Sequence, residues 1–149
     1  MEKLNQKYKK LMQALSTLEK ASETLKIFVK EGVSYNPHLD YEEEYRGLRD
    51  SAIQRFEYST DLFWKYLKVY LEKVLALPDI NGPRPVIRTS YSSNVINEDE
   101  AEKALKMIDD RNMTSHIYVE EIAEDLAAKI PSYYTLMHTV ATRLAPPSS

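Results

Sequence analysis

The sequence predicts a single all-α domain, an antiparallel up-down bundle of four to five helices over residues 1–145. Apolar residues recur three and four positions apart over long stretches, which is the spacing of one helical face. Two segments open with the paired capping residues that mark helix starts. The chain has only three glycines, too few for the many tight turns of a β-sandwich or barrel.

The first two helices are expected to be long. An apolar stripe runs through residues 4–28, and Gly32 ends it. The second helix opens with Asp40 and the reciprocal capping residue Glu43, and is expected to continue to about Leu77. Because a short turn joins them, these helices are expected to form an antiparallel hairpin.

Residues 78–97 contain three prolines and are expected to form an ordered loop with at most one helical turn, around Val86–Thr89. A third helix is expected to begin at Asn97, with Glu100 as its capping partner. A fourth follows an apolar stripe through residues 122–144. Pro131 lies inside that stripe, which predicts a kink or a one-turn break.

Composition limits the function classes. The chain has no cysteine, which excludes disulfides, thiolate metal sites and cysteine nucleophiles; the three histidines are too scattered for metal ligation, so no metal and no cofactor is expected. The net charge of −3 gives no global basic field, so nucleic acid would have to bind a local patch.

No run of apolar residues is long enough to span a membrane, which predicts a soluble, cytoplasmic protein. Residues 146–149 are expected to form a disordered tail.

The candidate site is a polar run from Asp109 to Tyr118, beside a predicted helix end. Arg111 and His116 lie within one and a half turns and can reach one face. A guanidinium binds phosphate bidentately and stabilises transition-state charge, and an imidazole moves protons near neutral pH. The alternative is a purely structural role, in which Arg111 pairs with a nearby acid such as Asp109, or with helix-end carbonyls.

Additional phosphate or nucleotide contacts are expected from four polar residues. Two lie in the 78–97 segment and contribute if that segment folds toward the same end of the bundle. The other two lie within the polar run itself. The four are Arg84, Arg88, Asn112 and Ser115.

The string RNMTSHIY at residues 111–118 fits the pattern Arg-x4-His-x-Tyr and resembles the HEPN family. It resembles in particular the HepT branch, which includes nucleotidyltransferase substrate-binding subunits. Three blocks carry the likeness in the family's order, at residues 53–68, 82–88 and 109–123. Val119 departs from the pattern, because a small polar helix cap is expected after the tyrosine.

The resemblance implies a homodimeric helical bundle that acts with a separate minimal nucleotidyltransferase, often as a toxin–antitoxin pair. It implies metal-independent RNA cleavage, with His116 as the proton-transfer group and Arg111 as the phosphate and transition-state group. The partner would silence this activity by transferring AMP to Tyr118. The resemblance also allows a non-catalytic subunit that binds nucleotide or substrate for the partner, or a plain scaffold. The sequence alone leaves open whether the chain is an enzyme.

Tyr118 adds a geometric expectation. On a regular helix, His116 and Tyr118 would point about 200° apart. For both side chains to serve one cleft, the chain must leave helical geometry between Ser115 and Val119. A turn at this point also exposes the phenol to a partner enzyme.

Overall fold

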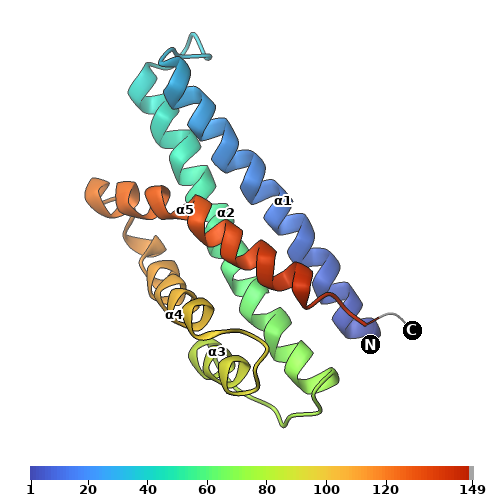
Figure 1. The fold of residues 1–149 in the computed structure, drawn as a ribbon. Coiled ribbons are helices and arrows are strands. Elements are labelled where there is room, and N and C mark those ends of the chain that lie inside the picture. Colours follow the sequence, from blue (N-terminus) through green and yellow to red (C-terminus); the bar gives the residue numbers. More distant parts are fainter. Residues whose placement is uncertain (148–149) are drawn as a thin grey trace.

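The computed structural model describes residues 1–147, within which the chain forms five α-helices and one 3-10 helix (Figure 1). No strand occurs in this described part, which confirms the all-α class and the helical bundle. Residues 148–149 of the expected tail lie outside it. The elements are α1 (Glu2–Glu31), α2 (Tyr41–Lys73), α3 (Pro83–Ser92), α4 (Glu98–Asn112), η1 (Thr114–His116) and α5 (Glu120–Arg143).

Helices α1 and α2 form the predicted antiparallel hairpin and pack along their length (Figure 1). Gly32 ends α1 in the left-handed region, with φ 69°, and its N–H donates to the Phe28 carbonyl at 3.0 Å. At the start of α2, the Glu43 N–H donates to Asp40 Oδ1 at 2.8 Å, within the predicted capping box. Both expected boundaries are confirmed.

The predicted end of α2 near Leu77 is wrong by about one turn. The helix ends at Lys73. Ala76 adopts a left-handed conformation with φ 54°, and the Leu77 N–H donates back to the Leu71 carbonyl at 3.0 Å. The chain therefore leaves the helix before it reaches Pro78.

The prediction of a mostly non-helical 78–97 segment is also wrong, because α3 is a ten-residue helix. Gly82 precedes it with φ 100°, and Pro83 occupies the first turn, where its missing N–H has no cost. Val86 and Ile87 are buried and pack into the core. Burial of this apolar pair in the core thus stabilises the helix. The sequence does not predict it, because prolines usually indicate a loop.

Helix α4 begins as predicted, with the Glu100 N–H donating to Asn97 Oδ1 at 2.8 Å. Helix α5 contains Pro131 and is continuous, so the predicted one-turn break does not occur. Figure 1 shows that α5 changes direction along its course, as the alternative of a kink predicts. The phenol of Tyr66 on α2 donates to the Leu144 carbonyl at 2.5 Å, which fastens the end of α5 to the hairpin.

The core lies between α2 and the helices around it, and every helix contributes buried apolar side chains to one cluster. This packing sets the α4–α5 junction against the middle of α2, since α2 contacts α4, η1 and α5. Within the described residues, no helix is long and apolar enough to cross a membrane.

Candidate functional site

Arg111, in the last turn of α4, is held by two carboxylates of α2. Its Nε donates to Asp61 Oδ1 at 2.7 Å and its Nη2 to Asp61 Oδ2 at 2.8 Å. Its Nη1 lies 3.5 Å from Glu57 Oε2. The hydrogen bonds to Asp61 raise the pKa of Arg111 above its usual range. The guanidinium is therefore part of a mixed-charge cluster that joins α4 to α2.

Thr114 extends this cluster into the 3-10 helix η1. Its hydroxyl donates to Glu57 Oε2 at 2.7 Å and lies 2.9 Å from the Arg111 carbonyl oxygen. Thr114 is buried, so the contact ties the start of η1 to α2. A groove of about 380 Å³ runs alongside, with Thr114 and Ile117 on one side and polar residues of α2 on the other, including Asp50, Gln54 and Glu57.

His116 and Tyr118 lie where the chain leaves helical geometry, as the sequence predicts. The 3-10 helix ends at His116, and Val119 is extended with φ −86° and ψ 113°. This turn brings His116 Nδ1 to 3.5 Å from the Tyr118 phenol oxygen. Tyr118 is 79% exposed. The two side chains of the motif therefore form one accessible pair.

Val119 precedes α5 without a capping side chain, which agrees with its departure from the family pattern. In its place, a side chain from α2 anchors the helix start. Arg49 donates from Nη1 to Glu120 Oε2 at 2.8 Å and from Nη2 to Glu120 Oε1 at 3.3 Å. No local signal in the sequence identifies Arg49, because its partner lies 71 residues further along the chain.

The other candidate residues lie in three different settings. Arg84, at the start of α3, pairs with Asp109 Oδ1 at 2.7 Å and so lies beside the last turn of α4. Asn112 and Ser115 are exposed within the motif segment. Arg88 is exposed on α3 and forms no ion pair with residues 1–147. Asp109 thus binds Arg84. The alternative that Arg111 pairs with an acid is met by Asp61 and not by Asp109.

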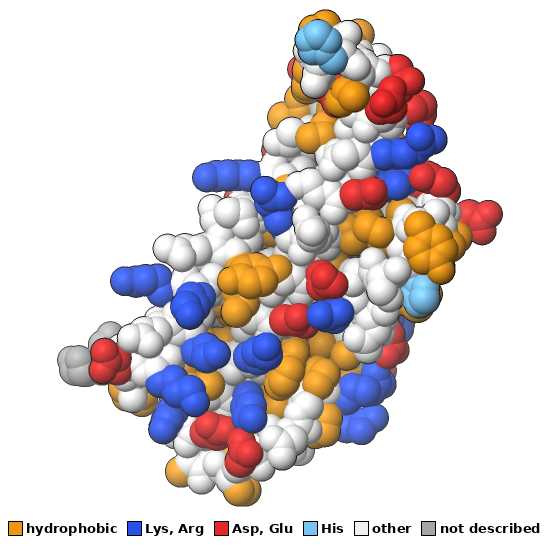
Figure 2. Space-filling view, turned by 180° about the vertical axis from the view of Figure 1, so that it is seen from behind, with side chains coloured by type: hydrophobic (Ala, Val, Ile, Leu, Met, Phe, Trp, Pro, Cys, Tyr) orange, Lys and Arg blue, Asp and Glu red, His pale blue; other side chains and the backbone are white. Residues whose placement is uncertain are grey.

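A positively charged region lies away from this cluster, on α1 and the C-terminal half of α2. Figure 2 shows Lys and Arg side chains gathered over the lower left of the visible face. Burial, followed by repulsion from Lys10, Lys3 and Lys65, lowers the pKa of Lys7 below its usual range. This repulsion indicates a local basic patch on a chain whose net charge is −3.

The charges around Arg111 and the exposure of His116 and Tyr118 differ in what they allow chemically. Glu57 and Asp61 together carry more charge than Arg111, so the cluster as it stands does not attract an anion. The Tyr118 phenol and the His116 imidazole, in contrast, are exposed and contact each other rather than a charged side chain. No group of three or more metal-ligating side chains occurs in the described part of the chain.

Comparisons with known proteins agree with this fold. A protein from Thermus thermophilus, ttk003001694, is 33% identical, with a TM-score of 0.72 over 91% of this chain and 99% of that chain. The Haemophilus influenzae protein HI0074, described as having the fold of a substrate binding domain of a nucleotidyltransferase, is 23% identical, with a TM-score of 0.66 over 89% and 99%. No curated protein matches in sequence.

A family model described as "nucleotidyltransferase substrate binding protein like" matches residues 6–146, which is nearly the whole chain. The match includes the Arg-x4-His-x-Tyr segment and both sets of contacts that fasten it to α2. The resemblance identified from the motif is confirmed at the level of the family. The chain therefore belongs to the nucleotidyltransferase substrate binding protein-like family.

Proposed function

We propose that this chain is the substrate-binding subunit of a two-component nucleotidyltransferase, and that it presents Tyr118 to a separate minimal nucleotidyltransferase. The family match supports the kind of partner. The observation that carries the proposal is the exposed Tyr118 phenol, which lies 3.5 Å from His116 Nδ1. An acceptor hydroxyl must protrude to enter the active site of another enzyme, and this phenol does so.

The proposed transfer uses ATP bound by the partner. The Tyr118 phenol oxygen attacks the α-phosphorus, the bond to the β-phosphate oxygen breaks, and pyrophosphate leaves. The phenol proton passes to His116 Nδ1, which lies within reach after a small approach. The products are AMP esterified to Tyr118, pyrophosphate and a proton.

A ribonuclease activity is the second candidate. In this case His116 transfers protons and Arg111 binds the scissile phosphate, with Arg84, Arg88, Asn112 and Ser115 as further phosphate contacts. The exposed His116 at the end of η1 favours this reading. The pairing of Arg111 with Asp61 counts against it, because phosphate would have to displace a bidentate carboxylate. AMP on Tyr118 would then block RNA by charge and by volume.

We propose in addition that the chain forms a homodimer through the motif face. Two large apolar side chains other than the acceptor Tyr118 are exposed within and next to the motif segment, namely Met113 and Val119. Removing apolar surface of this kind from water lowers the free energy, so these side chains favour contact with a second copy of the chain. Such a dimer would bring the two motif segments close to each other.

Co-expression with a minimal nucleotidyltransferase tests the proposed function. Mass spectrometry should find the mass of AMP on the peptide that contains Tyr118, and no such mass in the Tyr118→Phe variant. Absence of the adduct beside a partner shown to be active would overturn the proposal.

An RNA-degradation assay without the partner tests the ribonuclease reading. That reading predicts loss of cleavage in His116→Ala, and faster cleavage in Asp61→Asn, because the variant frees Arg111 for phosphate. A wild-type protein that leaves RNA intact would remove this candidate and leave the substrate-binding subunit.

A further inference from the structure

Arg49 is an almost completely buried arginine that plays no part in the function proposed so far. Its side chain is 1% exposed and extends from α2 toward the start of α5. Nε donates to Asp50 Oδ1 at 3.0 Å, and the two Nη atoms donate to the carboxylate of Glu120. A buried guanidinium is costly unless its donors are matched. All three nitrogens of Arg49 are matched.

Glu120 is the first residue of α5 and lies two positions after Tyr118. The helix start has no side-chain cap, because Val119 offers no acceptor. The hydrogen bonds from Arg49 hold the pKa of the Glu120 carboxyl below its usual range, so the carboxylate is charged near neutral pH. A bidentate contact with a buried arginine therefore fixes the first turn, in place of a cap.

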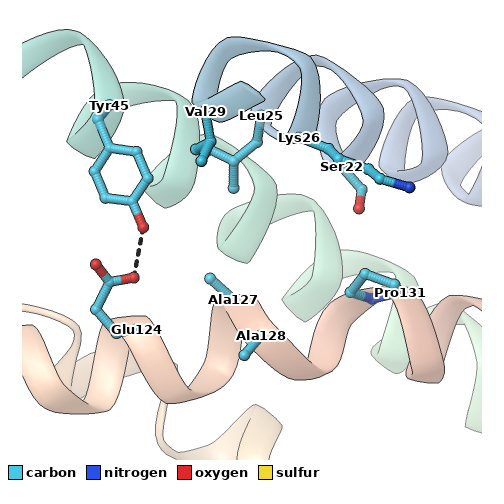
Figure 3. A pocket seen from close by; sticks show the side chains of 9 residues that line it. All are labelled: Ser22, Leu25, Lys26, Val29, Tyr45, Glu124, Ala127, Ala128 and Pro131. Atoms are coloured by element: carbon cyan, nitrogen blue, oxygen red, sulfur yellow. Dashed lines mark hydrogen bonds between the residues drawn. The ribbon is translucent and has the colours of Figure 1, made fainter. Parts of the chain in front are cut away.

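Tyr45 strengthens this anchor from the same helix. The Arg49 guanidinium lies 5.8 Å from the centre of the Tyr45 ring. The Tyr45 phenol donates to Glu124 Oε2 at 2.5 Å, at one end of a separate pocket between α1 and α5 (Figure 3). Glu124 is one helical turn beyond Glu120. Two successive turns of α5 are thus bound to α2 from one side.

The opposite end of the motif segment is fastened to the same helix. Arg111 donates two hydrogen bonds to Asp61, and Asp61 lies 12 residues after Arg49 in α2. This separation is about 18 Å along a helix. Residues 112–119 therefore run between two charged anchors on one rigid element, and Tyr118 lies next to the second anchor.

We propose that Arg49 is a positioning residue, which through Glu120 fixes the start of α5 so that the Tyr118 phenol stays outward and beside His116. The inference rests on the proposed role of Tyr118 as the nucleotide acceptor. Without the contact, the first turn of α5 has no cap and keeps only the exposed contact between Arg46 and Glu120, at 3.3 Å, so it frays. The phenol then samples many positions. A misplacement of about 1 Å at a reacting group can reduce a rate by about a hundredfold.

The sharpest test compares two neighbouring glutamates. Glu120→Gln weakens the contact with Arg49, whereas Glu121→Gln removes the same charge from the same turn, and Glu121 makes no ion pair within residues 1–147. Both variants lose the same favourable interaction with the helix dipole. The rate of AMP transfer from ATP to Tyr118 by an active nucleotidyltransferase should fall about tenfold or more in Glu120→Gln. It should change less than about twofold in Glu121→Gln, with the KM for ATP unchanged in both.

Arg49→Met and Arg46→Ala form a second pair. Arg46 also contacts Glu120, at 3.3 Å, but from an exposed position. Arg49→Met should slow transfer as Glu120→Gln does, and Arg46→Ala should not. The double variant Arg49→Met, Glu120→Gln should be no slower than Arg49→Met alone, because both substitutions break one contact. Equal transfer rates in Glu120→Gln and Glu121→Gln would overturn the inference, as would additive losses in the double variant.

Hydrogen exchange distinguishes failure of this inference from failure of the proposed function. The amides of Val119, Ile122 and Ala123, which at the start of α5 donate to backbone carbonyls, should lose protection in Glu120→Gln but not in Glu121→Gln, with the rest of α5 unchanged. If the wild type receives no AMP, the acceptor role of Tyr118 fails, and exchange still shows whether the anchor exists. Unchanged protection of the Val119, Ile122 and Ala123 amides in Glu120→Gln would contradict the anchor itself.

Discussion

At the scale of single residues, Arg111 illustrates what a sequence pattern can and cannot predict. The spacing to His116 singles it out, and its position at the end of α4 is as expected. Its partners are not visible in the sequence, because Asp61 and Glu57 lie 50 and 54 positions away on another helix. The sequence therefore identifies the residue but not its contacts. The same limit applies to Arg49, since nothing in a sequence marks a buried arginine.

The contacts of Arg111 predict that it stabilises the fold. Its side chain is 30% exposed and carries a bidentate hydrogen bond to Asp61. Arg111→Ala should lower the free energy of unfolding by about 1–3 kcal/mol, since hydrogen bonds to charged groups are lost. His116→Ala should change it by less than about 0.5 kcal/mol. Urea denaturation followed by circular dichroism measures both.

Arg88→Ala is the matched control, because Arg88 is exposed and has no ion-pair partner in residues 1–147. It should behave like His116→Ala. If Arg111→Ala were as stable as Arg88→Ala, the cluster with Asp61 would contribute nothing, and Arg111 would be free to bind phosphate.

At the scale of elements, local signals predict the helices that depend on local contacts. Gly32 and the two capping boxes, at Asp40 and Asn97, mark boundaries that the structure confirms. Helix α3 is missed because its stability comes from burying Val86 and Ile87 against other helices. The prolines at its start point to a loop in the sequence, yet a proline is compatible with a first helical turn.

The start of α5 should respond to acid. The pKa of Glu120 is lowered below 4.5 by the hydrogen bonds from Arg49. The stabilising contact is therefore fully present above pH 4.5 and is lost as the pH falls through the lowered pKa. Protection factors of the Val119, Ile122 and Ala123 amides should fall in that range. In Glu120→Gln they should already be low at neutral pH, and a wild-type profile that matches the variant at every pH would contradict the anchor.

Gly47 offers a test of the α2 helix that is independent of the site chemistry. It lies inside α2, and an added Cβ would meet no atom within 4 Å. Gly47→Ala should therefore raise the free energy of unfolding by about 0.5–1 kcal/mol, because alanine loses less backbone entropy. A lower melting temperature in this variant would show that the position is more crowded than the structure describes.

At the scale of the whole molecule, the bundle holds the short segment 112–119, which includes the 3-10 helix η1, between two charged anchors on α2. The long α1–α2 hairpin gives this segment a rigid base, and the junction between α4 and α5 supplies its exposed groups. The motif is recognisable in the sequence because its residues are close along the chain. The ion pairs that hold it to α2 are not, because they join residues far apart in the sequence.

The assembly prediction concerns the same surface. Light scattering at micromolar concentration should give the mass of a dimer, because Met113 and Val119 are exposed around the motif. Met113→Glu should shift the equilibrium toward the monomer without loss of helix content. The exposed apolar residue Tyr35 lies in the α1–α2 turn, and Tyr35→Glu should leave the dimer intact. A monomeric wild type would contradict this prediction.

Labelled ATP shows directly whether Tyr118 accepts a nucleotidyl group. The purified chain is incubated with an active minimal nucleotidyltransferase and ATP labelled at either the α- or the γ-phosphate. The α-label, and not the γ-label, should become bound to the wild-type chain and should be absent from Tyr118→Phe. Label from the γ-phosphate, or equal α-label on Tyr118→Phe, would contradict the acceptor role of Tyr118.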